Sequence, residues 1–312
     1  ERLQWAATLN PALRLTQDAD ELLRDPTLDA LGLFTLADIR PRLLRDALRR
    51  GKHVIAEKPI AATVPEEEDL LKEIEAAPSL VAVNLFNRNA WYHHEMQAFI
   101  RRGEIGRLAA LIISHQAAGG LMPTEGHQPE GPPFHDCGMH YVDVARWYAQ
   151  SEYDRWDAQG LRLWTWKDPW WVTAHGAFRN GVAFNITQSF AYGQLAKDKV
   201  VRCGMDVIGT LGVIRMSHDF SQVTIEYHGV NTTEHKVGPY GGKKLDVLCE
   251  KFAASLDAGR SLDLPLARDS VVASAVSQAM LDQAARHAPA VGAPEELERI
   301  LAHRRELRRA RS

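Results

Sequence analysis

The sequence has few cysteines and no long apolar segment. Its three cysteines, Cys137, Cys203 and Cys249, are isolated from one another, and none belongs to a Cys-x-x-Cys pair. This usage argues against a disulfide scaffold or a thiolate zinc site and is typical of a reducing compartment, so we expect a cytoplasmic protein. No apolar run approaches the ~18 residues of a membrane span, and no membrane association is expected. The formal net charge of −3 gives no indication of a nucleic-acid-binding surface.

The first part of the chain alternates between short apolar runs and amphipathic segments. Strands are predicted at residues 30–36, 53–56 and 80–86, and helices at 39–50 and 63–77. Strands separated by helices of this length predict a parallel sheet with right-handed crossovers. A length of 312 residues allows two domains. We therefore assign residues 1–88 to a first domain, built on this parallel sheet.

The second part of the chain, residues 89–312, is expected to form an α/β domain with a large open sheet, mostly antiparallel. Helices are predicted at 93–102, 135–149, 243–258 and 266–287. Between residues 156 and 237 several β-rich runs follow one another with no long helix between them, which is typical of an antiparallel or mixed sheet. A loop at 119–133, rich in Gly and Pro, is long enough to be a lid or a substrate loop. An open sheet usually needs covering, so we expect a homo-oligomer.

The first group of residues with chemical potential is Glu57-Lys58-Pro59, directly after the predicted strand 53–56. Ligands of parallel α/β sheets bind at the carboxyl ends of strands. A lysine at this place can donate a hydrogen bond to a substrate oxygen and lower the pKa of a hydroxyl group. The alternative is a surface turn with an incidental ion pair.

The second group is Asp136, His140 and Asp143, which are spaced to lie on one face of the predicted helix 135–149. A histidine can act as general base, and a neighbouring carboxylate can orient the imidazole or the substrate. The alternative is a helix N-terminus favoured by Asp136, with His140 hydrogen-bonded in the core. The spacing differs from His-Glu-x-x-His and no second cluster is evident, so no metal is predicted.

Together these motifs resemble the glucose–fructose oxidoreductase / inositol dehydrogenase (GFO/IDH/MocA) family. The stretch from Gly51 to Ala61, GKHVIAEKPIA, is similar to the family's most recognisable segment, and Asp-x-Gly-x-His follows at Asp136–His140. Asn87-Arg88 is similar to the family's domain junction. The resemblance covers residues 18 to 287. It implies a Rossmann domain joined to an open-sheet domain, and hydride transfer between NAD or NADP and a hydroxyl carbon of a sugar, cyclitol or similar polyol.

The resemblance also implies residue roles. Lys58 would polarise the substrate hydroxyl, His140 would take its proton, and Asp136 would hold the substrate or the imidazole. The residues expected to bind the cofactor are Thr35, Leu36, Glu57, Lys58, Pro59 and Arg88. Two other functions remain open within the same fold: a non-catalytic dinucleotide-binding sensor, and an NAD-dependent, redox-assisted glycosidase.

Two features depart from the family pattern. The sequence contains no Gly-x-Gly-x-x-Gly for the phosphate site. The family pattern places that loop, with the first two strands, before Glu1, so we expect the chain as written to be unstable and to bind dinucleotide poorly. The turn after the predicted strand 30–36 reads Thr35-Leu36-Ala37-Asp38-Ile39-Arg40, where the family more often has Thr-Pro and a following His. Arg40 is expected either to meet a phosphate or ribose or, the preferred alternative, to be solvated.

Aromatic residues gather in one further segment, where Trp164, Trp166, Trp170 and Trp171 lie close together. Trp164 and Trp166 alternate as strand residues do, which favours packing over a sugar-binding role. His93 and His94 open a predicted helix and are expected at the surface.

Overall fold

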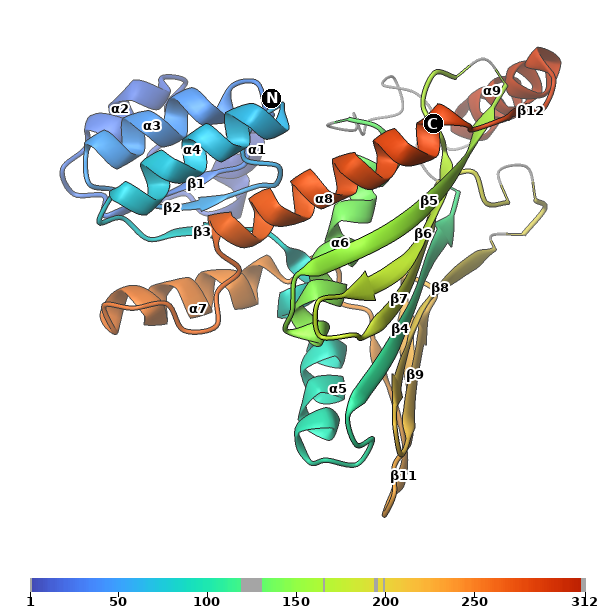
Figure 1. Ribbon diagram of the computed structural model, residues 1–312. Helices are drawn as coiled ribbons and strands as arrows, with labels where there is room; N and C mark the ends of the chain where they lie inside the picture. Colours follow the sequence, from blue (N-terminus) through green and yellow to red (C-terminus); the bar gives the residue numbers. More distant parts are fainter. Residues whose placement is uncertain (1, 119–130, 165, 194–195, 199, 310–312) are drawn as a thin grey trace. The chain divides into compact units, whose positions relative to one another are not determined.

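The computed structural model describes residues 2–118, 131–164, 166–193, 196–198 and 200–309 (Figure 1). The chain divides into two compact units. The first comprises Glu1–Asn84 and Lys251–Ala267, and the second comprises Leu85–Glu250 and Arg268–Ser312. The segment Lys251–Ala267 joins the first unit because the Pro265 carbonyl accepts a hydrogen bond from the Val83 amide (2.8 Å). Most of the expected loop at 119–133 (119–130), with His127, lies outside the described residues.

The first unit contains a parallel sheet of three strands in the order β1-β2-β3, formed by Ala30–Leu33, His53–Ala56 and Val81–Val83. The register pairs Ala30 with His53 and Val54 with Val81. The helices are α1 (Arg2–Leu9), α2 (Ala19–Arg24), α3 (Arg40–Arg49) and α4 (Val64–Ala76). The parallel sheet predicted from the alternation of strands and helices is confirmed.

Local sequence explains the helices of this unit. Helix α3 buries Leu43, Leu44 and Ala47 on one face, as the apolar spacing predicts. Helix α4 begins after Thr63, whose hydroxyl accepts a hydrogen bond from the Glu66 amide (3.4 Å) and so caps the helix.

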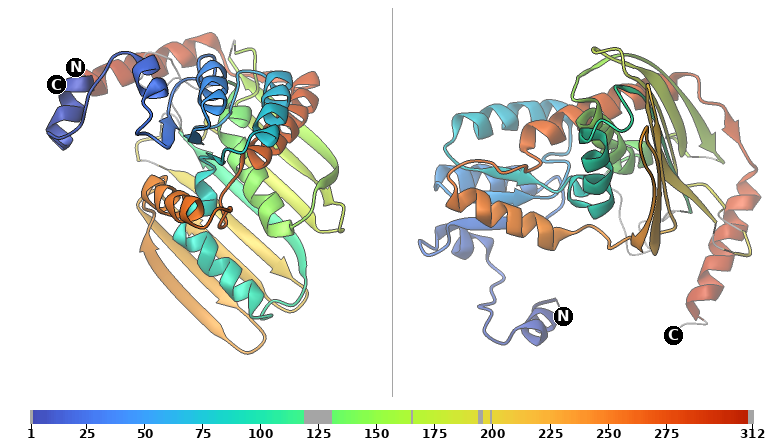
Figure 2. Two further views of the ribbon diagram at one scale, coloured as in Figure 1. Left: turned by 90° about the vertical axis from the view of Figure 1, so that its left-hand side faces the viewer. Right: turned by 90° about the horizontal axis from the view of Figure 1, so that it is seen from below.

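The second unit is built on a large mixed sheet (Figure 2). Its nine strands follow the order β11-β10-β9-β8-β4-β7-β6-β5-β12. The pairs β4–β7 and β5–β12 are parallel and the other pairs are antiparallel, which confirms the predicted mostly antiparallel sheet. The strands are Leu108–Ala117 (β4), Tyr153–Leu163 (β5), Trp171–Phe178 (β6), Ala183–Ser189 (β7), Val201–Gly209 (β8), Val213–His218 (β9), Gln222–His228 (β10), Thr233–Pro239 (β11) and Ala290–Val291 (β12).

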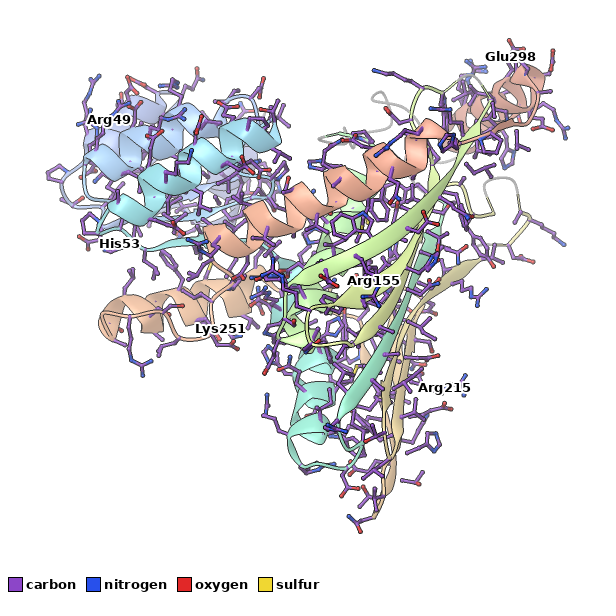
Figure 3. The ribbon with its side chains drawn as sticks, in the orientation of Figure 1. Arg49, His53, Arg155, Arg215, Lys251 and Glu298 are labelled. Carbon is purple, nitrogen blue, oxygen red and sulfur yellow. The ribbon has the colours of Figure 1, made fainter. Side chains whose placement is uncertain are left out.

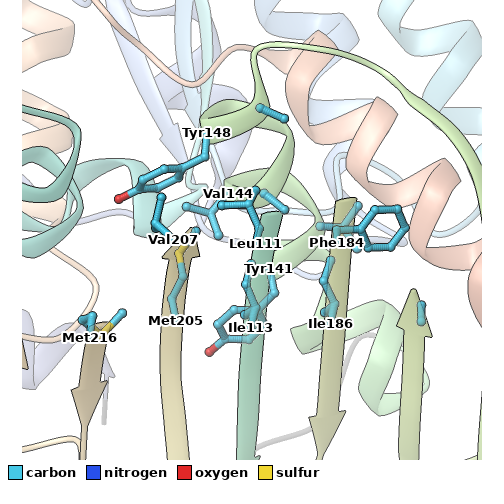
Figure 4. Close-up of a cluster of buried hydrophobic side chains, with 14 of the residues drawn as sticks. Leu111, Ile113, Tyr141, Val144, Tyr148, Phe184, Ile186, Met205, Val207 and Met216 are labelled. Carbon is cyan, nitrogen blue, oxygen red and sulfur yellow. The ribbon is translucent and has the colours of Figure 1, made fainter. Parts of the chain in front are cut away.

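Helices cover one face of this sheet. They include α5 (Trp91–Arg101), α6 (Met139–Ala149) and α8 (Ala267–Arg286). Two more helices complete this part of the sequence: α7 (Leu245–Asp257) precedes α8, and α9 (Pro294–Arg309) follows β12. The core lies between α6 and the strands, where Leu111, Ile113, Phe184, Ile186, Met205, Val207, Tyr141, Val144 and Tyr148 meet (Figure 4). Residues on the other face of β4 alternate with these and are more exposed, as Ile112 is at 44%. Among the described residues, none of the helices combines the length and apolarity needed to span a bilayer.

Candidate functional site

The carboxyl ends of β1, β2 and β3 bring several predicted residues together in the first unit. The Glu57 amide donates to the Leu33 carbonyl (3.1 Å), and the Asn84 amide donates to the Ala56 carbonyl (2.8 Å). Glu57 also accepts a hydrogen bond at Oε1 from Asn84 Nδ2 (2.9 Å). The strand-end turns that carry Thr35, Glu57 and Asn84 are therefore neighbours, at the edge where ligands of parallel sheets bind.

Arg40 joins two of these turns, and the preferred expectation that it is solvated is wrong. Its side chain is fully buried, and its guanidinium donates hydrogen bonds to the carbonyls of Thr35 and Pro59. The turn after β1 lacks the proline typical of the family, and a buried arginine holds it instead. A guanidinium suits this task because its planar donors reach two acceptors at once.

Lys58 lies in the second of these turns. It is buried, at 8% exposure, and the Lys58–Pro59 peptide bond is cis. The Lys58 amide donates to Glu57 Oε2 (3.3 Å), and the Ile60 amide, just beyond Pro59, donates to Oε1 of the buried Glu67 (3.0 Å). The Glu57-Lys58-Pro59 turn is thus fixed on both sides by carboxylates, unlike an ordinary surface turn.

Two buried polar atoms at the same edge have no hydrogen-bond partner among the described residues. They are Thr35 Oγ1, after β1, and Asn84 Oδ1, after β3. Buried polar groups are normally satisfied, so such atoms point to a water or a ligand. A hydroxyl and an amide oxygen suit the hydroxyl and amide groups of a nicotinamide riboside. The strand-end edge therefore fits that half of a dinucleotide, while the sequence offers no Gly-x-Gly-x-x-Gly for its pyrophosphate.

In the second unit the Asp-x-Gly-x-His motif begins with a π-helical turn. This turn, Phe134–Gly138 (η3), precedes α6. A π-helical turn adds a residue to the helical repeat and is frequent at functional sites. The expectation of a helix over 135–149 therefore holds with a π-helical first turn, and Asp136, His140 and Asp143 are all buried. A Cβ on Gly138 would lie 2.9 Å from Cδ2 of the Phe134 ring, so glycine permits the tight turn.

His140 and Asp136 are both buried. The His140 ring meets the Phe86 ring edge-to-face at a centroid distance of 4.4 Å, and its carbonyl accepts a hydrogen bond from Asn87 Nδ2 (3.2 Å). His135 Nε2 lies 2.9 Å from the Ser274 hydroxyl. Phe86 and Asn87 belong to a 3-10 turn, Phe86–Asn89 (η1), where the sequence predicted the end of a strand.

Asp143 and Arg88 form a buried ion pair. Arg88 Nε donates to Asp143 Oδ2 (2.9 Å) and Nη2 to Oδ1 (2.6 Å), and Nη1 lies 3.1 Å from Asp269 Oδ2. Burial raises the pKa of Asp143 to about 6, against the opposing effect of Arg88. The expectation that Arg88 binds cofactor stays a prediction, but its guanidinium already contacts two carboxylates.

The predicted site residues thus fall in both units. The strand-end edge of the first unit holds Thr35, Leu36, Glu57, Lys58 and Pro59, and the second unit holds Arg88, Asp136 and His140. Asn84 and Phe86 were not predicted as site residues, and Asn87 was named only as part of the domain junction. Asn84 and Asn87 flank the predicted strand end in the sequence, and their position after an apolar run was the signal that could have identified them.

Other expectations concern residues away from these groups. His93 is buried on α5 and its Nδ1 lies 3.1 Å from the Tyr148 hydroxyl, so the expected surface position is wrong. Trp164, Trp166 and Trp170 lie between β5 and β6, and only Trp171 belongs to a strand. Their rings contact one another, with centroids 4.7 Å (Trp164–Trp166) and 3.9 Å (Trp166–Trp170) apart.

Comparisons with known proteins agree with this architecture. Residues 3–85 match the family model described as "Oxidoreductase family, NAD-binding Rossmann fold", and residues 93–215 match the GFO/IDH/MocA C-terminal domain. An oxidoreductase from Agrobacterium radiobacter, solved in complex with NAD+, L-tartaric acid and magnesium, has a similar fold. Its TM-score is 0.80 at 20% identity, over 91% of this chain and 86% of that one.

Two curated relatives match parts of the chain. The 1,5-anhydro-D-fructose reductase of Ensifer adhaerens is 32% identical over 115 residues, which are 37% of this chain and 34% of the relative. The scyllo-inositol 2-dehydrogenase (NAD(+)) of Bacillus subtilis is 24% identical over 203 residues, which are 64% of this chain and 58% of the relative. The chain thus spans between a third and three fifths of these relatives.

A parallel α/β unit with polar strand ends, joined in sequence to a unit with a large mixed sheet, defines a Rossmann-type oxidoreductase fold. Both parts match models of one family in the order that the chain presents them. The chain belongs to the GFO/IDH/MocA oxidoreductase family.

Proposed function

We propose that the protein is a nicotinamide-dependent oxidoreductase that moves hydride between NAD or NADP and a hydroxyl carbon of a sugar, cyclitol or similar polyol. The observation that carries the proposal is the Glu57-Lys58-Pro59 turn at the carboxyl edge of the parallel sheet. Beside it, Thr35 Oγ1 and Asn84 Oδ1 are buried with no hydrogen-bond partner in the part of the chain that the structure describes. The names of the curated relatives, an anhydrofructose reductase and an inositol dehydrogenase, support the substrate class.

The residues of the chain would divide the work on the substrate hydroxyl. The Lys58 ammonium would donate a hydrogen bond to the hydroxyl oxygen and stabilise the developing alkoxide, His140 would accept the proton as general base, and Asp136 would orient the substrate or the imidazole. A bound oxidised nicotinamide would accept the hydride from the carbon that carries this hydroxyl. Lys58 belongs to the first unit and His140 to the second, and their joint action is inferred from the family resemblance.

The cofactor would lie along the strand ends of the first unit. Thr35 and Leu36 would line the dinucleotide, Glu57 would lie near the nicotinamide ribose, and Pro59 would shape the turn. Glu57 is already oriented by Asn84, which would preset its carboxylate to accept hydrogen bonds from ribose hydroxyls.

The test is turnover of the full-length gene product with a panel of sugars and polyols, followed by the absorbance of the reduced cofactor. Lys58→Ala and His140→Ala should each lower kcat by about a hundredfold or more. Matched controls are Lys72→Ala and His235→Ala, whose side chains are exposed. Near-normal rates in the Lys58 and His140 variants would refute the assigned roles. Saturable cofactor binding without turnover of any substrate would favour the dinucleotide-binding sensor or a glycosidase with bound cofactor.

We also propose that the protein is a cytoplasmic homo-oligomer in which a second copy covers the face of the nine-stranded sheet opposite α5 and α6. That face carries Arg215 (Figure 3), which pairs with Glu226 across β9 and β10 at 3.3 Å, and the exposed Ile112 on β4. A solution mass equal to one chain, measured by light scattering at micromolar concentration, would contradict the oligomer.

A further inference from the structure

Each residue of the short segment Phe86-Asn87-Arg88 contacts α6 at His140 or one turn beyond it. Phe86 meets the imidazole ring edge-to-face at a centroid distance of 4.4 Å. Asn87 Nδ2 donates to the His140 carbonyl (3.2 Å). Arg88 binds Asp143, which lies three residues after His140 on the same helix. The ring, the backbone and the next turn of the helix are thus all held by η1.

The Arg88–Asp143 pair is the strongest of these contacts. It is bidentate, with N···O distances of 2.9 and 2.6 Å. The Asp143 side chain is 0% exposed and the Arg88 side chain 11%. A bidentate pair fixes the angle as well as the distance between its partners, and a buried pair is costly to break. Helix α6 cannot rotate or slide against η1 without separating these groups.

The rest of the Arg88 guanidinium is also in contact with its surroundings. Its Nη1 lies 3.1 Å from Asp269 Oδ2 near the start of α8, and its Cζ lies 6.0 Å from the centre of the Trp147 ring. The guanidinium is therefore held from η1, α6 and α8 together. Such a constrained cation suits the positioning of a helix better than the recruitment of a mobile ligand.

We propose that Arg88 and Asp143 are positioning residues that set the rotation of α6 and thereby the place of the His140 imidazole. The catalytic consequence rests on the proposed function, in which His140 is the general base. The structural claim, that the pair places the ring against Phe86, stands apart from it. In this proposal Arg88 acts through the helix and not by touching the reacting atoms.

The chain offers a matched control in Arg146. This residue lies six positions after His140 on α6, its side chain is 16% exposed, and it also binds Asp269, at 2.8 Å. Its remaining donors bind Glu152 (2.8 and 2.6 Å), at the far end of α6 from His140. Arg146→Lys therefore perturbs a comparable ion pair on the same helix without touching the Arg88–Asp143 contact.

The experiment compares Arg88→Lys, Asp143→Asn and Arg146→Lys by two measurements. The first is the NMR chemical shift of the His140 ring resonances. This shift reports the position of the imidazole because the neighbouring Phe86 ring displaces the resonances of nuclei close to it. The His140 resonances are assigned by their loss in His140→Gln. The second is kcat and KM for a polyol that the wild type oxidises. Lysine keeps the charge of Arg88 but cannot form the bidentate pair. Asp143→Asn keeps the shape of the side chain and serves if Arg88→Lys does not fold.

We expect the His140 resonances to move in Arg88→Lys and Asp143→Asn and to stay in place in Arg146→Lys. We expect kcat to fall by about tenfold or more in the first two variants, with KM changed by less than about threefold, because a displaced base slows chemistry without weakening binding. Unmoved His140 resonances in both Arg88→Lys and Asp143→Asn, or equal losses of kcat in all three variants, would overturn the proposal. If the wild type oxidises no polyol, the proposed function fails, and the resonances alone decide the positioning role.

Discussion

Replacing Arg40 by methionine should loosen the strand ends of the first unit. The Arg40 side chain is fully buried and donates to the carbonyls of Thr35 and Pro59. Methionine keeps the apolar stem but donates nothing, so both carbonyls lose a donor. A hydrogen bond to a charged group contributes ~1.5–3 kcal/mol. The two bonds together therefore predict a loss of about 3 kcal/mol or more in the free energy of opening this region.

Amide hydrogen exchange read by mass spectrometry suits this prediction, because it reports each unit separately. A loss of about 3 kcal/mol corresponds to a roughly hundredfold faster exchange. We expect that acceleration in peptides that cover β1, β2 and the turn at Lys58. Peptides from β8 and β9 in the second unit should exchange as in the wild type and serve as an internal reference.

The matched control is Arg42→Met on the same helix. The Arg42 side chain is 61% exposed, and its ion pairs with Asp20 and Asp46 are 3.9 and 3.6 Å long. Exposed pairs contribute only ~0–1 kcal/mol. Equal exchange in Arg40→Met and Arg42→Met, or acceleration spread evenly over both units, would refute the role assigned to Arg40.

Two further predictions concern the second unit. Burial lowers the pKa of His93 to about 3 and of His115 and His218 to about 4. Below about pH 6.5 these histidines bind protons in the unfolded chain but stay neutral in the folded one. Protonation therefore favours the unfolded chain, and the free energy of unfolding should fall as the pH drops from about 6.5 toward 4. Asp143, with its raised pKa, acts in the opposite direction but is one group against three. A urea midpoint, followed by tryptophan fluorescence, that is unchanged or higher at about pH 5 than at about pH 7 would contradict this. Separately, Gly138→Ala should cost ~1–3 kcal/mol by overpacking, because its Cβ would lie 2.9 Å from the Phe134 ring; an unchanged melting temperature would contradict this.

Local patterns carried much of the fold. The apolar runs at β1 and β2, the cap at Thr63 and the stop of α3 at Gly51 depend on neighbours in the sequence, and all were predictable. The succession of β-rich runs in the second part of the chain also predicted a mostly antiparallel sheet. The start of strand β5 at Tyr153 was not predicted, because charged residues such as Asp154 and Arg155 interrupt the apolar alternation there.

Candidate site residues could be named from the sequence where residue type and spacing suggest chemistry. Glu57, Lys58, Asp136 and His140 were named in this way, and their roles stay predictions. Arg40 donates to the carbonyls of Thr35 and Pro59, five and nineteen residues away, and a pattern of side chains carries no information on such backbone acceptors. The burial of His93 likewise depends on Tyr148, fifty-five residues away, and the π-helical turn at Phe134–Gly138 leaves the helical composition unchanged.

The central claim is hydride transfer from a hydroxyl carbon to nicotinamide, and isotope transfer tests it most directly. The full-length gene product would be incubated with oxidised cofactor and polyols deuterated at the carbinol carbons, and the cofactor analysed by mass spectrometry. We expect deuterium in the reduced nicotinamide, a slower rate with the deuterated substrate, and loss of both in His140→Ala. Tight cofactor binding with no transfer of deuterium from any substrate would contradict the claim.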